Sequence, residues 1–363
     1  MRLIIHIGAQ KTGTTSIQNF LKLNEESLKK QSILIPNSIR YINTFNHRWI
    51  CGFAYKDNIL NNIKSLKNIY GLSNILISEK ISEFKKEIDE SDSDLCIISS
   101  EHLSISINSK KEVEKLKNVL EDTFDDIKIL IYIRRPIDQA ISLLSTQIKG
   151  GRYITSFSKN YTLGARWFRK TNNIKKILRI WESNFPKNLM VRIFDSKEFY
   201  EDNLVKDFCK NCKIFYRDDF LLPDKKNRSL DLEQMKYINY FNKLIKLKRI
   251  NISSSQIDTV KTLIRKNIKS KNFLKPSREE YYNFEKFFNS DEAWIRKKYF
   301  PHRDYIWSNE INDFRKTKNI FNKFSDLEFK NLNLFFNRAL KVSTIRNPYL
   351  RAISEFIHFK KIP

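Results

Sequence analysis

Residues 4–16 read IIHIGAQKTGTTS, and this stretch decides the fold. Residues 2–7 are mostly apolar and rich in β-branched side chains, as is typical of a short strand covered on both faces. Apolar residues then recur at helical spacing, at Ile17, Phe20 and Leu21. The hydroxyl and backbone N–H groups of residues 13–16 are therefore predicted at a helix N-terminus, where anions bind. We predict a bound phosphate ester.

The lysine of this turn comes before the glycine. The Walker A pattern GxxxxGK[ST] places lysine after its second glycine, whereas Lys11 precedes Gly13. This order predicts a relative of the nucleotide-binding P-loop and disfavours a kinase. A polar turn that only caps a helix is the alternative, but a cap does not require a lysine, a glycine and three hydroxyls together.

A second motif follows another apolar strand, residues 129–133. Arg134, Arg135 and Pro136 come directly after it, and the next helix bears Ser142. An arginine at a strand end offers a fork of donors to a phosphate, and a serine can add a hydroxyl donor. Proline suits the first turn of a helix. The motif predicts a second phosphate site; a surface arginine pair that caps the strand is the alternative.

A third apolar strand, residues 95–99, also ends in polar residues. In open α/β sheets ligands gather at the carboxyl ends of the strands, so the three strand ends are predicted to share one crevice. Either Glu101 or His102 could take a proton from a hydroxyl there. Glu101 could instead cap a helix or pair with an arginine. His47 is a further candidate base, with a packing role as its alternative.

Residues 10–21, QKTGTTSIQNFL, resemble the 5′-phosphosulfate-binding loop (PKxGTT) of sulfotransferases that use 3′-phosphoadenosine 5′-phosphosulfate, PAPS, with Gln10 in place of proline. The RxPxxxxxS pattern from Arg134 to Ser142 is similar to the 3′-phosphate motif of that family. Arg134 has the family's spacing, and Arg135 is a secondary candidate. The SSEHL segment, residues 99–103, resembles bacterial carbohydrate sulfotransferases.

The resemblance implies PAPS as the sulfuryl donor, no metal, and a catalytic lysine that contacts the bridging oxygen. Glu101 becomes the first candidate for the base and His102 the second. Arg228, in an NRSL segment that recurs in the bacterial relatives, is a further candidate for phosphate, with a helix-capping loop as its alternative. The residues implied in donor binding are Gln10, Lys11, Thr12, Gly13, Thr14, Thr15, Ser16, Arg134, Ser142 and Arg228.

Strands and helices alternate in the first half of the chain, which is typical of a parallel sheet with right-handed crossovers. We expect an α/β, P-loop-like, three-layer fold with a central parallel sheet of about five strands and a helical C-terminal half. Apolar stripes at residues 232–245 and 257–264 predict two of the later helices. The strands are expected near residues 2–8, 32–35, 95–99, 128–133 and 189–193.

The resemblance implies a sulfotransferase domain over residues 1–308, with the sheet in 1–195 and a helical part in 196–308. Residues 309–363 are expected to form a basic helical tail. In it Arg346 and Ser354 repeat the spacing of the 3′-phosphate motif. A remnant of a second sulfotransferase-like unit is one interpretation. A chance match in a tail that docks on the main domain or binds an anionic partner is the other.

The composition bounds the partners. The chain of 363 residues carries 67 Lys and Arg against 41 Asp and Glu, a formal net charge of +26. Such a field favours a polyanionic donor, an anionic glycan or a lipid headgroup. Nucleic acid is not expected, because the lysines are scattered and no nucleic-acid motif is present.

The cysteine spacing and the hydropathy bear on metal sites, disulfides and membrane segments. Cys209 and Cys212 have CxxC spacing without a second ligand pair, so neither a metal site nor a disulfide framework is predicted. No apolar run approaches the roughly 18 residues of a membrane helix, and Arg2 is followed too soon by the loop for a signal peptide. We expect a cytoplasmic protein, with peripheral membrane contact left open.

These observations favour an enzyme that moves a sulfuryl group from PAPS to a hydroxyl. By analogy with bacterial relatives, the acceptor is expected to be a carbohydrate or glycolipid of the cell surface. A nucleotide-dependent kinase and a non-catalytic protein that binds an anionic glycan are the alternatives.

Overall fold

A computed structural model describes residues 1–41, 44–55, 77–154, 165–223, 229–248, 250, 252–270, 272–307, 314–315 and 326–344. The chain divides into two compact units. Unit 1 consists of Met1–Arg135, Arg169–Asn227 and Phe288–Ser308, and unit 2 of Pro136–Phe168, Arg228–Phe287 and Asn309–Pro363.

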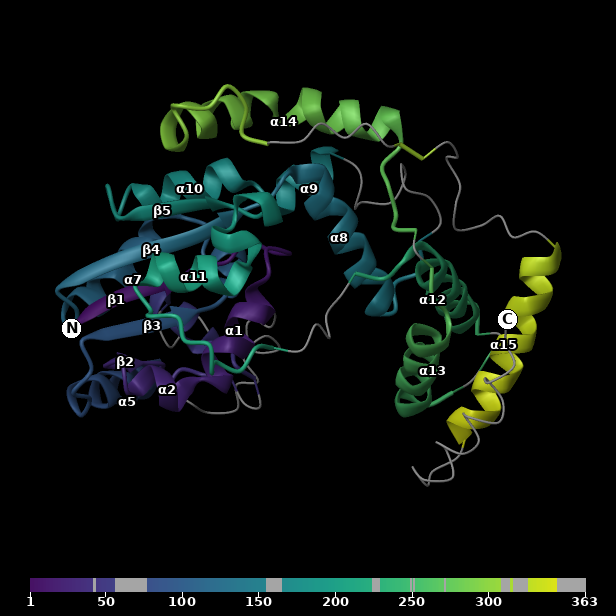
Figure 1. Cartoon of the computed structure of the whole chain (residues 1–363), viewed down its shortest axis with the longest axis horizontal. Coiled ribbons are helices and arrows are strands. Elements are labelled where there is room, and N and C mark those ends of the chain that lie inside the picture. The colour runs from purple at the N-terminus through teal and green to yellow at the C-terminus, as the bar shows by residue number, and fades with distance from the viewer. Residues whose placement is uncertain are drawn as a thin grey trace. The chain divides into compact units, whose positions relative to one another are not determined.

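Unit 1 is built on a five-stranded sheet in the order β2-β3-β1-β4-β5, in which every neighbouring pair is parallel (Figure 1). Ile4 on the central strand lies between Ile97 and Lys128 of its two neighbours. The predicted strands and their parallel arrangement are confirmed. The strands are β1 (Arg2–His6), β2 (Ile33–Leu34), β3 (Leu95–Ser99), β4 (Asp126–Ile133) and β5 (Leu189–Ile193).

Helices cover both faces of the sheet and give the expected three layers. One face packs Ile4 with Phe20 and Phe208, and the other packs Ile5 with Trp181, because successive strand residues face opposite sides. The first face carries α1 (Thr14–Leu23), α2 (Glu25–Lys29) and α11 (Leu204–Cys212). The second face carries α5 (Ile77–Asp89), α7 (Lys110–Glu121) and α10 (Ile174–Glu182).

Shorter elements complete unit 1. The segment after α14 (Arg278–Tyr299) is fixed by the Arg303 guanidinium, which donates to both carboxylate oxygens of Glu198 at 2.8 and 2.7 Å. Residues of α14 from Phe288 onward belong to this unit. The other elements are η1 (Arg48–Ala54), α6 (His102–Ser106), η2 (Ser196–Glu198) and η3 (Tyr200–Asp202), and α9 (Ala165–Thr171) ends in unit 1.

Unit 2 is helical. Its described elements are α8 (Pro136–Lys149), α12 (Leu232–Lys246), α13 (Ser254–Asn267) and α15 (Asp326–Thr344). Capping boxes at Asp231 and Ser253 begin α12 and α13. Phe241 of α12 stacks on Phe336 of α15 at 5.5 Å between ring centroids. The buried residues of the two apolar stripes are Met235, Ile238, Phe241, Val260, Leu263 and Ile264. The helical character of the C-terminal half is therefore confirmed for these residues.

Two parts of the sequence prediction stay open. The tail is helical over α15, whereas Arg346 and Ser354 lie outside the described residues. The expected boundaries at residues 195 and 308 remain predictions.

Two fully buried histidines in unit 1 make its stability depend on pH. Burial lowers the pKa of both His6 and His47 to about 3, so both are neutral in the folded protein. An unfolded histidine titrates near 6.5 and therefore binds more protons than the folded one between pH 6.5 and 3. The free energy of unfolding is expected to fall as the pH falls through this window, by about 1.4 kcal/mol per pH unit for each histidine.

Denaturant unfolding at pH 6.5 and 4.5 measures this dependence. His6→Asn should reduce the pH dependence relative to the wild type, whereas His302→Asn, at an exposed position, should leave it unchanged. Equal pH dependence in all three proteins would contradict the role given to the buried imidazole.

Candidate active site

The loop between β1 and α1 has a compact, strained backbone. Lys11 and Gly13 both adopt left-handed conformations, with φ of 64° and 75°. The Thr12 hydroxyl is buried and donates to the carbonyl of Ala9 at 2.6 Å. Within the described part of the chain, the backbone N–H groups of residues 13–15 find no acceptor. The loop therefore offers free donors at the start of α1, the arrangement that binds phosphate.

Gly13 is required by its surroundings as well as by its φ. A Cβ at this position would lie 2.4 Å from Cδ2 of Leu204 and 2.9 Å from Cε2 of Phe194. Gly13→Ala is therefore expected to destabilise the protein by more than the roughly 1–2 kcal/mol that a left-handed residue costs. Denaturant unfolding checks this. Gly150→Ala is the matched control, because its Cβ would meet nothing closer than 3.4 Å; equal losses in the two variants would contradict the packing argument.

Two cations meet at this loop. Arg134 follows β4, which pairs with β1, and its Nη1 donates to the carbonyl of Lys11 at 3.1 Å. The Arg134 guanidinium also lies over the ring of Phe194, 5.4 Å from its centroid. Burial lowers the pKa of Lys11, Arg134 lowers it further, and Glu101 opposes both. Two positive charges at one loop create a field suited to a multiply charged anion.

Glu101 follows β3, on the other side of β1. Its Oε2 accepts hydrogen bonds from Nε2 of Gln18 at 2.8 Å and Nδ2 of Asn46 at 2.7 Å. Among the described residues no donor reaches Oε1, no arginine forms an ion pair with Glu101, and its side chain makes no capping bond to α6. One carboxylate oxygen is thus held by two amides while the other is free to accept a proton.

The two histidines near Glu101 differ in their environments. Burial lowers the pKa of His102 most, Arg48 lowers it further, and Glu101 raises it. His102 thus remains a second candidate base. In His47, Nδ1 accepts from the N–H of Ser99 at 3.0 Å and Nε2 donates to the carbonyl of Pro36 at 3.0 Å. Because both ring nitrogens are occupied, the geometry of His47 supports its packing role.

The remaining predicted donor-binding residues fall into two groups. In the first turn of α1, Thr14 is buried, Thr15 is exposed and Ser16 is half-buried. Gln10, in the loop before α1, is also half-buried. Ser142 lies on α8 in unit 2, where its side chain is buried.

The geometry of the loop does not test two further predicted phosphate ligands, Arg228 and Arg135. Arg228 lies outside the described residues. Arg135 is buried and is the last residue of the first segment of unit 1. The joint action of Arg134 and Ser142 stays a prediction.

The structure adds positioning residues that the sequence did not indicate. Gln18 and Asn46 hold Glu101, and Asn46 also accepts from the hydroxyl of Ser100 at 2.7 Å. Ser104 ties α6 to the loop by donating to the carbonyl of Gly8 at 2.8 Å. Gln18 lies four residues after Thr14 on α1 and so shares its helix face, the one signal that could have found it.

The cysteines of α11 are buried thiols, not surface ligands. Cys209 and Cys212 are buried free thiols, and burial raises the pKa of Cys209 to about 12. The described ranges contain no group of three or more His, Cys, Asp or Glu arranged to hold a metal ion. They also contain no helix that combines the length and the apolar character needed to cross a membrane.

Comparison with known proteins gives one structural likeness. No family model matches the chain, and no curated protein matches it either. A crystal structure of a sulfotransferase from Alicyclobacillus acidocaldarius is similar over 69% of this chain and 97% of its own, with 17% sequence identity and a TM-score of 0.40. The function is therefore inferred from the residues that follow β1, β3 and β4 in this chain, which are the phosphate loop, Glu101 and Arg134.

Proposed function

We propose that this chain is a sulfotransferase that moves the sulfuryl group of PAPS to a hydroxyl of an acceptor. The observation that carries the proposal is the meeting of Lys11 and Arg134 at a loop with free N–H donors, with Glu101 near the lysine. The PKxGTT-like order of the loop, with lysine before glycine, favours PAPS over a nucleoside triphosphate.

The residues of the loop fit the donor's phosphates. The free N–H groups of residues 13–15 and the ammonium of Lys11 can bind the 5′-phosphosulfate, and Arg134 can bind the 3′-phosphate through its guanidinium fork. PAPS supplies a sulfuryl group joined to a phosphate through a bridging oxygen. No metal is assigned a role.

Glu101 is the proposed base. Its free Oε1 accepts the proton of the acceptor hydroxyl as the acceptor oxygen forms a bond to sulfur and the bond from sulfur to the bridging oxygen breaks. Lys11 donates to that departing oxygen, which leaves with the electron pair on 3′-phosphoadenosine 5′-phosphate. Gln18 and Asn46 hold the carboxylate in place throughout. A carbohydrate or glycolipid acceptor and a cytoplasmic location complete the proposal.

Transfer of label from PAPS tests the proposal. The protein is incubated with sulfur-labelled PAPS and the organism's own glycans and lipids, and the labelled product is identified. Label should enter a glycan or glycolipid with the wild type and not with Lys11→Ala. Label transfer from γ-labelled ATP, and none from PAPS, would overturn the proposal in favour of a kinase.

A further inference from the structure

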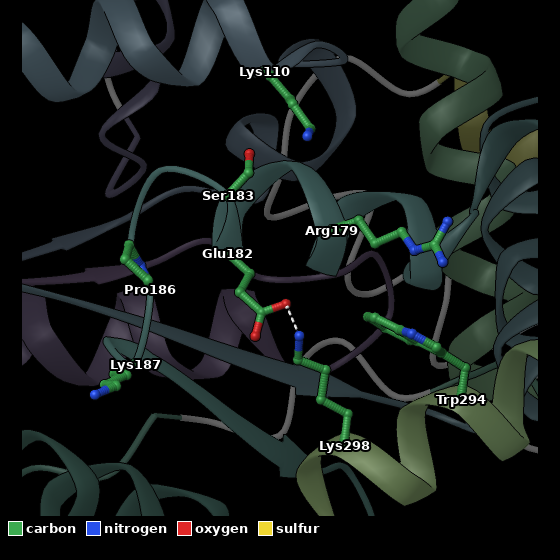
Figure 2. Close-up of a pocket in the computed structure, with 8 residues that line it drawn as sticks. All are labelled: Lys110, Arg179, Glu182, Ser183, Pro186, Lys187, Trp294 and Lys298. Atoms are coloured by element: carbon green, nitrogen blue, oxygen red, sulfur yellow. Dashed lines mark ion pairs between the residues drawn. The ribbon is translucent and has the colours of Figure 1, made fainter.

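A pocket of unit 1, of about 700 Å³, lies apart from the phosphate loop (Figure 2). Its walls come from the start of α7, the end of α10, the turn that enters β5, and α14. Lys187 in that turn precedes the amino end of β5, whereas the phosphate loop follows the carboxyl end of β1. Because the strands are parallel, Lys187 and the phosphate loop lie at opposite ends of the strands.

The pocket is strongly basic. Its described lining contains four cations, Lys110, Arg179, Lys187 and Lys298, and one acid, Glu182. Glu182 pairs with Lys298 at 2.5 Å, as the dashed line in Figure 2 shows. Among the described residues no carboxylate pairs with the other three cations. Three uncompensated charges spread along one pocket attract a ligand with several anionic groups.

An indole ring stands among these cations. Trp294 is half-buried on α14, and the Arg179 guanidinium lies 5.2 Å and the Lys298 ammonium 5.5 Å from its ring centroid. Figure 2 shows the side chains of Arg179 and Lys298 next to the Trp294 ring. Pro186 adds a second apolar surface to the lining. The pocket thus combines cations for an acid group with a flat apolar face for the body that carries it.

We propose that this pocket binds an acidic oligosaccharide, whose separate sulfate, phosphate or carboxylate groups contact Lys110, Arg179 and Lys187 while one sugar ring lies against Trp294. Binding of a simple anion would require only the cations and not the Trp294 ring. Sites for single-stranded nucleic acid present successive aromatic side chains along a groove. Among the described residues that line this pocket, Trp294 is the single aromatic one. The combination therefore favours a saccharide.

Binding of the full chain to a heparin oligosaccharide, without PAPS, tests the inference. Its desulfated counterpart, inorganic sulfate and a single-stranded oligonucleotide are titrated in parallel at several salt concentrations. Arg179→Gln/Lys187→Gln is expected to weaken oligosaccharide binding by about tenfold or more, because charged hydrogen bonds are lost. Lys176→Gln/Lys297→Gln removes the same charge from exposed positions outside the pocket and should have a much smaller effect.

A third variant separates the saccharide from a simple anion. Trp294→Leu should weaken binding of the oligosaccharide and leave that of inorganic sulfate unchanged, with thermal unfolding as the check that the protein is folded. The inference would be overturned if the two double variants lost oligosaccharide binding equally. It would also be overturned if the wild type bound the oligonucleotide more tightly than the oligosaccharide and Arg179→Gln/Lys187→Gln lost that binding. Since no donor is present, either failure leaves the proposed sulfuryl transfer untouched.

Discussion

Glu101→Gln is expected to lower turnover by roughly 10² to 10⁴ while donor affinity stays unchanged, because a general base contributes about that much. The amide keeps the shape of the carboxylate and one oxygen for Gln18 and Asn46, so the site should remain assembled. It cannot take the proton from the acceptor hydroxyl. Turnover with labelled PAPS and titration with 3′-phosphoadenosine 5′-phosphate separate chemistry from binding.

Two further variants sharpen this result. Glu83→Gln makes the same chemical change on α5 and should leave turnover unchanged. His102→Asn tests the second candidate base. If Glu101→Gln keeps wild-type turnover and His102→Asn loses it, the base is His102 and the role given to Glu101 is wrong.

Lys11→Ala is expected to impair both donor binding and chemistry. Loss of a charged hydrogen bond to the donor should weaken binding by about tenfold to a hundredfold. Removal of a donor that stabilises charge on a departing oxygen typically costs roughly 10² to 10³ in turnover. The same titration and turnover assays measure the two effects.

The control for Lys11 is a lysine that is exposed and remote from the loop. Lys30→Ala, after α2, removes an equal charge and should change neither quantity beyond a small effect of net charge. If Lys11→Ala keeps wild-type donor affinity and turnover, the phosphates of the donor bind elsewhere on the chain and the role given to Lys11 is wrong.

The strands and the loop were predictable because their signals are local. Short β-branched runs mark β1, β3 and β4, and each is buried on both faces as such runs require. The position of Gly13 is also consistent with its sequence, since glycine is favoured where the backbone before a helix is left-handed. Lys11 adopts the same conformation without any such preference, and the sequence gives no sign of it.

The rest depends on contacts between residues far apart in the chain. Gln18 reaches Glu101 across 83 positions and Asn46 across 55, distances at which periodicity carries no information. The basic pocket joins Lys110, Arg179 and Trp294 from three separate elements. Unit 2 likewise joins Pro136–Phe168 to Arg228–Phe287, which no local pattern indicates.

Calorimetric titration of the wild type and Arg134→Ala tests the central claim most directly. That claim is that the loop and Arg134 bind a nucleotide phosphorylated at both its 3′ and 5′ ends. The wild type should bind 3′-phosphoadenosine 5′-phosphate more tightly than adenosine 5′-phosphate or ATP with magnesium. Arg134→Ala should weaken binding of 3′-phosphoadenosine 5′-phosphate by about tenfold or more. It should weaken binding of adenosine 5′-phosphate much less. Tighter binding of ATP with magnesium, or an unchanged affinity in Arg134→Ala, would contradict the account.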